Sequence, residues 1–358
     1  MNVVLTGYFG FDNAGDEAIL TAVIHLLREQ DRTVSITVLS NQPDKTARQH
    51  SVTAVNRWSL RPVAGALRKA DVLISGGGSL FQDQTGVKSP VYYGGTILLA
   101  RLLRTKVMVY AQGIGPLTGK IGRALTAFAV NRASVVTVRD EASKALLSDL
   151  GVKKAIDVIP DPVMGHPYDD GQALPDGVPE GEYVAVSIRD WPKAVDLEER
   201  LIQMLSHPLR EGRQLVFLPM HEGEDDRFSR AIMDILKEKG YGDQLYLLGG
   251  DLPTEEKIRV TAQADFVIGM RLHALIFAAL TETPFLSVSY DPKIDAFAAL
   301  ASQPVIDHVE TPLKETGSIM REMDAFSDHL GDYRNAVRAF REKAGQEAKD
   351  SLAAIRKL

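Results

Sequence analysis

The feature that most constrains the fold is a regular alternation, along the whole 358-residue chain, of short apolar runs with longer segments of helical spacing. Strands that alternate with helices in this way form parallel sheets, because each parallel connection needs a crossover of a dozen or more residues. The first half predicts strands at 3–6, 34–39, 72–75, 107–111, 135–138 and 155–159, and helices at 17–30, 94–103, 122–133 and 141–150.

Prolines and glycines interrupt this alternation between residues 160 and 182, and a second series then begins. It predicts strands at 184–188, 214–218, 245–247, 266–268 and 285–289, and helices at 197–205, 226–239, 253–264 and 273–280. A chain of this length also exceeds what one core normally holds. We therefore expect domains at 1–165 and 183–330, a linker at 166–182, and a C-terminal helix at 331–358 that packs back across the domains.

The predicted fold class is α/β, with two doubly wound Rossmann-like domains facing a cleft, as in the glycosyltransferase-B architecture. Ligands in such sheets bind beyond the carboxyl ends of the strands, where helix N-termini present free N–H groups. The segments that follow predicted strands are therefore the places to look for chemistry.

Charge and composition narrow the function classes. The formal net charge of −6 argues against broad nucleic-acid binding, so an anionic ligand must be bound by local arginines. The absence of cysteine excludes disulfides and cysteine nucleophiles. The chain has no basic, apolar leader and no run of about 18 apolar residues, and we expect a cytoplasmic protein. Basic residues of the C-terminal helix, Arg334, Arg338 and Arg341 among them, could meet anionic lipid, although acids lie between them.

Two glycine-containing segments follow strands of the first domain. The segment 7–17 carries carboxylates that would repel phosphate and suit a hydroxyl-rich acceptor; its polar members are Asp12, Asn13, Asp16 and Glu17. Helix capping by Asn13 or Asp16 explains some of them equally well. The segment 74–83 contains Gly77 and Gly78, which either form a nest of N–H donors or make a sharp, closely packed turn.

Two arginines follow strands of the second domain. Arg189 ends a strand and can bind a carboxylate or phosphate with two N–H groups, or form a surface salt bridge with Asp190. Arg271 and His273 lie at the start of an apolar helix, where the helix dipole already favours negative charge. His308, after a further apolar run, is a candidate for acceptor or phosphate contacts. No carboxylate spacing groups ligands for a metal, and no cofactor is expected.

Taken together, several segments resemble the polysaccharide pyruvyl transferase family, and most closely its CsaB-type members, which modify secondary cell-wall polymers of bacteria. The resemblance is carried by GYFGFDNAGDEAIL at 7–20, ISGGGSLFQD at 74–83, YAQGIGP at 110–116, VRDEAS at 138–143 and MRLHALIFA at 270–278.

This resemblance implies an enzyme that moves the pyruvyl group of phosphoenolpyruvate onto a sugar as a cyclic ketal and releases phosphate. The implied acceptor is N-acetylmannosamine in a lipid-diphosphate-linked disaccharide, ketalised at its 4- and 6-hydroxyls, which would bring the enzyme to the inner membrane face. The Arg-Leu-His donor motif falls on Arg271, Leu272 and His273, and a further donor-binding arginine on Arg189.

Ketal formation needs at least one acid and one base. We hypothesise that His273 donates a proton or acts on the phosphate side, and that Asp12 or Glu17 accepts a proton from the sugar. Acceptor binding is assigned to Asp12, Asn13, Asp16, Glu17, Gly77, Gly78 and His308. Two other functions fit the predicted fold, namely a glycosyltransferase that uses a nucleotide sugar and a non-catalytic glycan-binding assembly protein.

Overall fold

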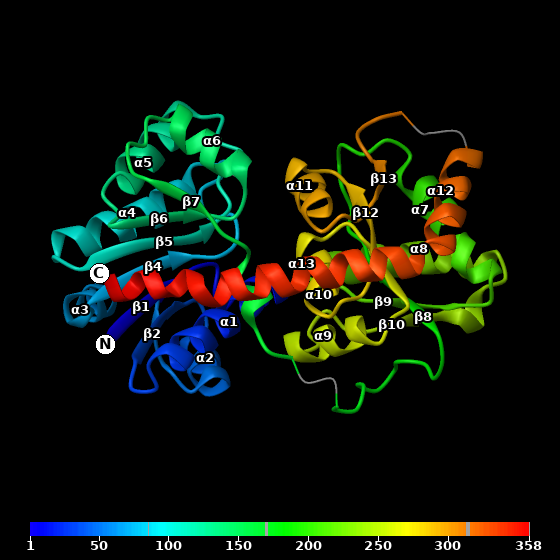
Figure 1. Cartoon of the computed structure of the whole chain (residues 1–358), viewed down its shortest axis with the longest axis horizontal. Coiled ribbons are helices and arrows are strands. Elements are labelled where there is room, and N and C mark those ends of the chain that lie inside the picture. The colour runs from blue at the N-terminus through cyan, green and yellow to red at the C-terminus, as the bar shows by residue number, and fades with distance from the viewer. Residues whose placement is uncertain (85, 169–170, 313–315, 358) are drawn as a thin grey trace. The chain divides into compact units, whose positions relative to one another are not determined.

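The computed structural model describes residues 1–84, 86–168, 171–312 and 316–357 (Figure 1). Its contacts divide the chain into two compact units. Unit 1 comprises Met1–His166 and Ala344–Leu358, and unit 2 comprises Pro167–Lys343. The predicted linker thus belongs with unit 2 from Pro167 onward. The chain returns to unit 1 at Ala344, inside its last long helix.

Unit 1 is built on a parallel seven-stranded sheet of order β3-β2-β1-β4-β5-β6-β7. Its inner strands consist almost entirely of buried residues, as expected for a sheet covered on both faces. The strands are β1 (Asn2–Thr6), β2 (Ser35–Ser40), β3 (Thr53–Asn56), β4 (Val72–Gly76), β5 (Lys106–Gln112), β6 (Val135–Val138) and β7 (Ile156–Val158).

Helices cover both faces of this sheet. One face packs against α3 (Leu60–Lys69), α4 (Lys88–Leu102), α5 (Lys120–Val130) and α6 (Glu141–Asp149), whose buried residues share one core cluster with the strands. Figure 1 shows α1 (Ala14–Gln30) and α2 (Pro43–His50) on the opposite side from α4 and α5. A short helix, η1 (Pro162–Gly165), packs on α1.

Unit 2 repeats the plan with a parallel six-stranded sheet of order β10-β9-β8-β11-β12-β13. The strands are β8 (Tyr183–Ser187), β9 (Gln214–Phe217), β10 (Leu245–Leu247), β11 (Phe266–Gly269), β12 (Phe285–Ser289) and β13 (Val305–His308). The order reverses between β8 and β11, which is the point at which such sheets bind ligands.

The helices of unit 2 also form two layers. One core cluster joins the sheet to α7 (Leu197–Arg210), α8 (Glu224–Glu238) and α12 (Thr316–Asp328). The remaining long helices that contact one another are α9 (Thr254–Ala262), α10 (Leu272–Leu280) and α11 (Pro292–Leu300), and a short helix, η2 (Gly242–Gln244), precedes β10. Apart from His273, helix α10 is apolar, and its residues from Ala274 onward are buried, because it lies between α9 and α11.

The C-terminal helix α13 (Leu330–Ser351) and the following η3 (Leu352–Lys357) contribute to both units. In unit 2, Arg334 donates to the carbonyl oxygen of Asp265, and Arg338 pairs with Glu282 at 2.8 Å. In unit 1, the Ser351 hydroxyl lies 2.8 Å from that of Tyr110. The arginines named as lipid contacts in the sequence are thus engaged with their own unit.

The α/β class with two Rossmann-like units is confirmed, but several elements escaped sequence analysis. Strands β3 and β13 lie at sheet edges, are short, and lack a long apolar run. Helix α2 buries only Thr46 and His50, so it has no apolar periodicity to detect. Local packing, rather than amphipathic spacing, stabilises these elements.

Candidate functional site

Because all strands in each sheet are parallel, the segments that follow them meet at one edge per unit. In unit 1 this carboxyl edge receives the segment 7–17 after β1, Gly77 and Gly78 after β4, and Arg139 after β6. In unit 2 it receives Arg189 after β8 and the segment 269–273 after β11.

In unit 1, Asn13 caps helix α1. Its side-chain oxygen accepts hydrogen bonds from the backbone N–H groups of Gly15, at 3.1 Å, and Asp16, at 3.2 Å. A side chain that satisfies these free N–H groups fixes the start of the helix. The capping interpretation of Asn13 therefore describes its contacts, and it places Asp16 in the first turn.

Two carboxylates brace the loop. Asp12 adopts a left-handed backbone with φ of 57° and accepts hydrogen bonds from Gln42 Nε2 at 2.8 Å and Lys45 Nζ at 2.7 Å. Glu17 accepts a hydrogen bond from the backbone N–H of Gly10 at 2.8 Å through one oxygen, and its other oxygen lies 3.9 Å from His50 Nε2. Both carboxylates are engaged in fixing the shape of the loop.

Asp16 differs from these two carboxylates. The described residues provide no hydrogen-bond partner for its side chain, and its Oδ1 lies 2.6 Å from where a Cβ on Gly78 would stand. Burial raises the pKa of Asp16 and the nearby Glu17 carboxylate acts in the same direction, so that the pKa reaches about 8 although Arg139 opposes the shift. A carboxyl with this pKa is mostly protonated at neutral pH and can donate a proton.

The glycine turn after β4 makes this packing possible. Gly77 and Gly78 both have left-handed backbones, with φ of 77° and 69°. A side chain on Gly77 would collide with Ile19, and one on Gly78 with Asp16. The Gly77 N–H donates to the carbonyl oxygen of Tyr110, so this donor is not free for an anion. The close-packed turn is the better description of the segment.

An arginine that sequence analysis did not single out organises the aromatic residues of this edge. Buried Arg57 donates to the carbonyl oxygen of Gly7 at 2.8 Å and to the Tyr93 hydroxyl at 3.1 Å. Its guanidinium lies over the rings of Phe11, Trp58, Tyr92 and Tyr93, at 4.1 to 5.4 Å from their centroids.

Trp58 remains 63% exposed despite this contact, and its indole N–H donates to Asn41 Oδ1 at 3.0 Å. An exposed aromatic ring held in place from behind offers a rigid flat surface to a ligand. Because Arg57 follows the undetected strand β3, its place at this edge could not be read from the sequence.

In unit 2, Arg189 and Arg271 leave neighbouring strands from matching positions. Ser187 of β8 and Gly269 of β11 are in register, and each arginine follows two residues later. Adjacent strands lie about 4.8 Å apart. The sheet therefore brings together two residues that are far apart in the sequence.

Arg271 is fixed by Asp225, a residue that sequence analysis did not identify. The Nε of Arg271 donates to Oδ2 of Asp225 at 2.9 Å, and its Nη2 donates to Oδ1. Asp225 is buried and also accepts hydrogen bonds from the backbone N–H groups of Met220 and His221. Arg271 therefore has one guanidinium edge fixed, while Nη1 has no protein partner among the described residues.

Arg189 has no carboxylate partner among the described residues. It donates to the carbonyl oxygen of Asp190, rather than to its side chain, and its Nη1 lies 3.4 Å from the Tyr290 hydroxyl. The guanidinium lies 5.4 Å from the ring centroid of Trp191 and 5.2 Å from that of Tyr290. The surface salt bridge with Asp190 is not formed, and the positive charge is available to an anion.

The other predicted residues of unit 2 occupy different surroundings. Leu272 begins α10 and is buried, whereas His273 is half-buried with its Nε2 shielded from solvent. His308 ends the edge strand β13, and its Nε2 lies 2.7 Å from Oδ1 of Asp295. His308 thus belongs to the same unit as the donor-side arginines, not to the unit of the other acceptor-side residues.

Lys257 supports the loop that precedes Asp225. Its buried ammonium donates to the carbonyl oxygens of Pro219 at 2.8 Å and Gly250 at 2.7 Å. Burial lowers the pKa of Lys257 to about 8, although nearby carboxylates, Asp226 and Asp225 foremost, act in the opposite direction. The segment between β9 and α8 is therefore fixed at both ends.

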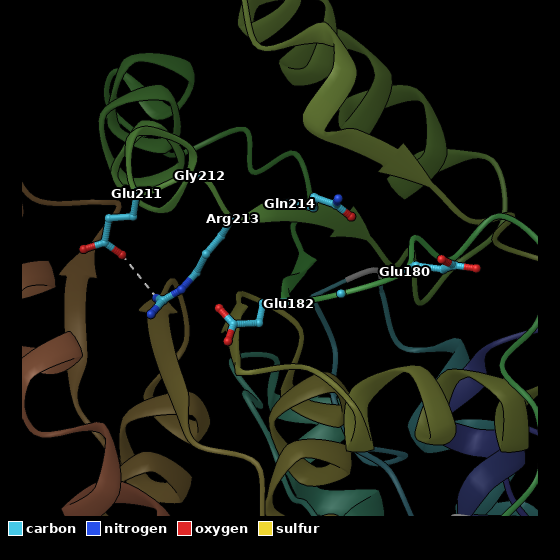
Figure 2. Close-up of a pocket in the computed structure, with 7 residues that line it drawn as sticks. Glu180, Glu182, Glu211, Gly212, Arg213 and Gln214 are labelled. Carbon is cyan, nitrogen blue, oxygen red and sulfur yellow. Dashed lines mark ion pairs between the residues drawn. The ribbon is translucent and has the colours of Figure 1, made fainter.

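The hollow in Figure 2, of roughly 550 Å³, lies at the other edge of the unit 2 sheet. It is lined at the starts of β8 and β9, where Arg213 pairs with Glu211 at 3.2 Å. None of the predicted site residues lines it.

Within the described ranges, no three His, Asp or Glu side chains are grouped to hold a metal. No helix in these ranges is long and apolar enough to cross a membrane.

The architecture is the GT-B fold, with two Rossmann-like units, as predicted. A UDP-GlcNAc 2-epimerase from Neisseria meningitidis, solved with UDP-GlcNAc, matches with a TM-score of 0.65 and 13% identity over 100% of both chains. A glycosyltransferase from Rickettsia africae matches with a TM-score of 0.66 and 11% identity over 99% of this chain and 97% of that one. At these identities the likeness shows the fold alone.

The family is shown by sequence. The chain belongs to the polysaccharide pyruvyl transferase family, whose model matches residues 13–292. This range contains the segment after β1 from Asn13 onward, the glycine turn, Arg189, Asp225 and Arg271. Family membership supports a transferase with a role in pyruvyl transfer. A comparison with curated proteins gives no match.

Proposed function

We propose that this protein moves the pyruvyl group of phosphoenolpyruvate onto a sugar as a cyclic ketal and releases phosphate. The observation that carries the proposal is the pair of arginines on neighbouring strand ends, Arg271 held by Asp225 and Arg189 without a carboxylate partner. Phosphoenolpyruvate carries a carboxylate and a phosphate, and guanidinium groups bind both with paired N–H donors.

The donor is assigned to unit 2. Arg189 and the remaining N–H groups of Arg271 bind the two anionic groups, and the N-terminus of α10 at Leu272 adds backbone N–H groups and a favourable dipole. His273, next in that turn, serves the phosphate side, where it protonates the departing phosphate. Asp225 acts as a positioning residue, because it orients Arg271 without reaching the donor itself.

The acceptor is assigned to unit 1. Asp12, Asn13 and Glu17 make contacts that fix the shape of the loop. The glycine turn packs against Asp16. Trp58 offers a flat ring against which the apolar face of a sugar can lie. We assign the acid–base role to Asp16 in place of Asp12 or Glu17. His308 is left outside the acceptor set.

In the proposed reaction, the methylene carbon of phosphoenolpyruvate gains a proton and a sugar hydroxyl adds to the adjacent carbon. The bond from that carbon to the phosphate oxygen then breaks, and the second hydroxyl closes the ketal. Each hydroxyl loses one proton, so one proton is consumed by the methylene carbon and the other leaves with phosphate. Asp16, protonated at neutral pH, gives the first proton and regains one from the sugar.

The proposed acceptor is N-acetylmannosamine in a lipid-diphosphate-linked disaccharide, with the ketal across its 4- and 6-hydroxyls, as for the CsaB-type members that the sequence resembles. The deciding experiment is mass spectrometry of this disaccharide after incubation with phosphoenolpyruvate. A mass gain of one pyruvyl ketal with equimolar phosphate supports the proposal. No gain, with release of a nucleoside diphosphate from an added nucleotide sugar, would instead identify a glycosyltransferase.

A further inference from the structure

Helices α3, α4 and α5 of unit 1 concentrate positive charge in a protein whose net charge is −6. Residues 84–138 contain seven lysines and arginines and no aspartate or glutamate. Residues 57–70 contain four lysines and arginines and again no aspartate or glutamate. The three helices pack their apolar sides on the same sheet face, so their exposed residues share one side of the unit. We call this surface the cationic face; its exposed cations are Arg61, Arg68, Lys69, Lys88, Arg101, Arg104, Lys106, Lys120 and Arg132.

These cations have no acidic partners in the described parts of the chain. Exposed lysines and arginines elsewhere commonly pair with neighbouring acids, as Lys144 does with Glu141 on α6 and Lys237 with Asp234 on α8. On the cationic face the hydrogen bonds that do form, such as those of Arg101 and Arg132, go to carbonyl oxygens of the same helix or its end. The face therefore carries an excess of positive charge, although Asp83 lies at the start of α5 and α6 on the same side contributes Glu141 and Asp149.

Large apolar side chains are exposed among the same cations. Leu102, Leu60 and Ile121 are 78%, 70% and 70% exposed, and Val91 and Phe128 are about half exposed. Single exposed apolar residues are ordinary, but these lie on three adjacent helices together with the unpaired cations. Cations beside exposed leucine, isoleucine and phenylalanine are the composition of surfaces that lie on a bilayer.

We infer that the cationic face of α3, α4 and α5 docks unit 1 onto an anionic phospholipid surface. Lysines and arginines are attracted to the negative headgroups, and the apolar side chains enter the boundary with the acyl chains. Aliphatic side chains spread over three helices gain most from an extended apolar boundary such as that of the acyl chains, which favours a lipid occupant over another polyanion. The inference deepens the proposed function, because a lipid-diphosphate-linked acceptor has to be met at a membrane surface.

The test is co-sedimentation of the full-length protein with vesicles of phosphatidylcholine alone and of phosphatidylcholine with phosphatidylglycerol. A charge variant reverses four exposed cations that make no side-chain hydrogen bond within the described part of the chain: Arg61→Glu, Arg68→Glu, Lys88→Glu and Lys120→Glu. A matched control makes the same change of charge on unit 2 with Arg210→Glu, Arg230→Glu, Lys237→Glu and Lys239→Glu. A third variant carries Leu60→Ser, Leu102→Ser and Ile121→Ser.

We expect the wild type to bind the anionic vesicles, with binding that weakens as salt rises. The charge variant should partition about a thousandfold less, the serine variant about tenfold less, and the control as the wild type does. Any of three outcomes would overturn the inference. The wild type does not bind the anionic vesicles, it binds neutral vesicles equally well, or the control variant loses binding as much as the charge variant does. A water-soluble acceptor should be turned over equally by the charge variant and the wild type, and failure of all proteins there would count against the proposed function alone.

Discussion

The Nε of Arg271 lies 2.9 Å from Oδ2 of Asp225, and Nη2 of the same guanidinium donates to the other carboxylate oxygen. Asp225 is buried, and two backbone N–H groups also donate to it. This carboxylate cannot swing away, so the direction of the Arg271 side chain is set before any ligand arrives. Such preorganisation is what a site for a doubly anionic donor requires.

The variant Asp225→Asn tests this relationship. The amide of Asn has one oxygen and one NH₂ group, so it can no longer accept hydrogen bonds from the Arg271 guanidinium through two oxygens. Arg271 loses its orientation, and we expect kcat/KM for phosphoenolpyruvate to fall by about a hundredfold. The KM for the acceptor should stay unchanged, which separates lost positioning from general damage. Steady-state kinetics measures both quantities. The exposed Asp234→Asn on α8 is the matched control and should match the wild type.

The variant Arg189→Lys tests the second donor contact. A lysine keeps the charge but loses the paired N–H groups and the contact with Trp191 and Tyr290. We expect kcat/KM for phosphoenolpyruvate to fall by about 10- to 100-fold, with the protein remaining folded. The exposed Lys193→Ala serves as control. Unchanged kinetics in Arg189→Lys would remove this residue from the donor site.

The variant Asp16→Asn tests the acid–base assignment. An amide cannot donate the proton, so kcat should fall by about 10²- to 10⁴-fold. In the wild type the protonated carboxyl is the active form, and activity should decline as pH rises through about 8. The residual activity of the variant should lack this decline, as a pH–rate profile would show.

The same variant has an opposite effect on stability. The folded-state pKa of Asp16 is raised above its unfolded value, so folding is increasingly disfavoured as pH rises from about 4 to about 8. Asn escapes this ionisation, and the melting temperature of Asp16→Asn should exceed that of the wild type most clearly above pH 8. A variant that melts below the wild type at every pH would show that burial does not strain this carboxyl.

The variant Trp58→Ala tests the proposed sugar platform. Loss of the exposed ring should raise the KM for a water-soluble acceptor about tenfold, while the KM for phosphoenolpyruvate stays unchanged. Leu60→Ala, two residues later and similarly exposed, is the control for loss of apolar surface. A rise in both Michaelis constants would point to a disturbed loop rather than to lost stacking.

Much of the fold could be predicted because buried parallel strands read as apolar runs. The strands at 72–76 and 285–289 consist wholly of buried residues, and local sequence identifies them directly. Strand β3 has no fully buried residue, and helix α2 has too few apolar residues for periodicity to reveal it. The undetected β3 also concealed Arg57, whose position at the carboxyl edge follows only from that strand.

The alternation of strands and helices was enough to predict which segments lie at the carboxyl edges, since it leaves little choice of topology. It thereby identified Arg189, Arg271 and the acidic loop after β1. Their partners could be found only in the folded chain, because Asp225 and Arg271 come from different strand–helix crossovers, 46 residues apart. The burial of Asp16 against Gly78 arises in the same way, where the loops of two adjacent strands meet. Local sequence records the residue types, but the pKa and orientation of a side chain depend on neighbours that only the sheet order supplies.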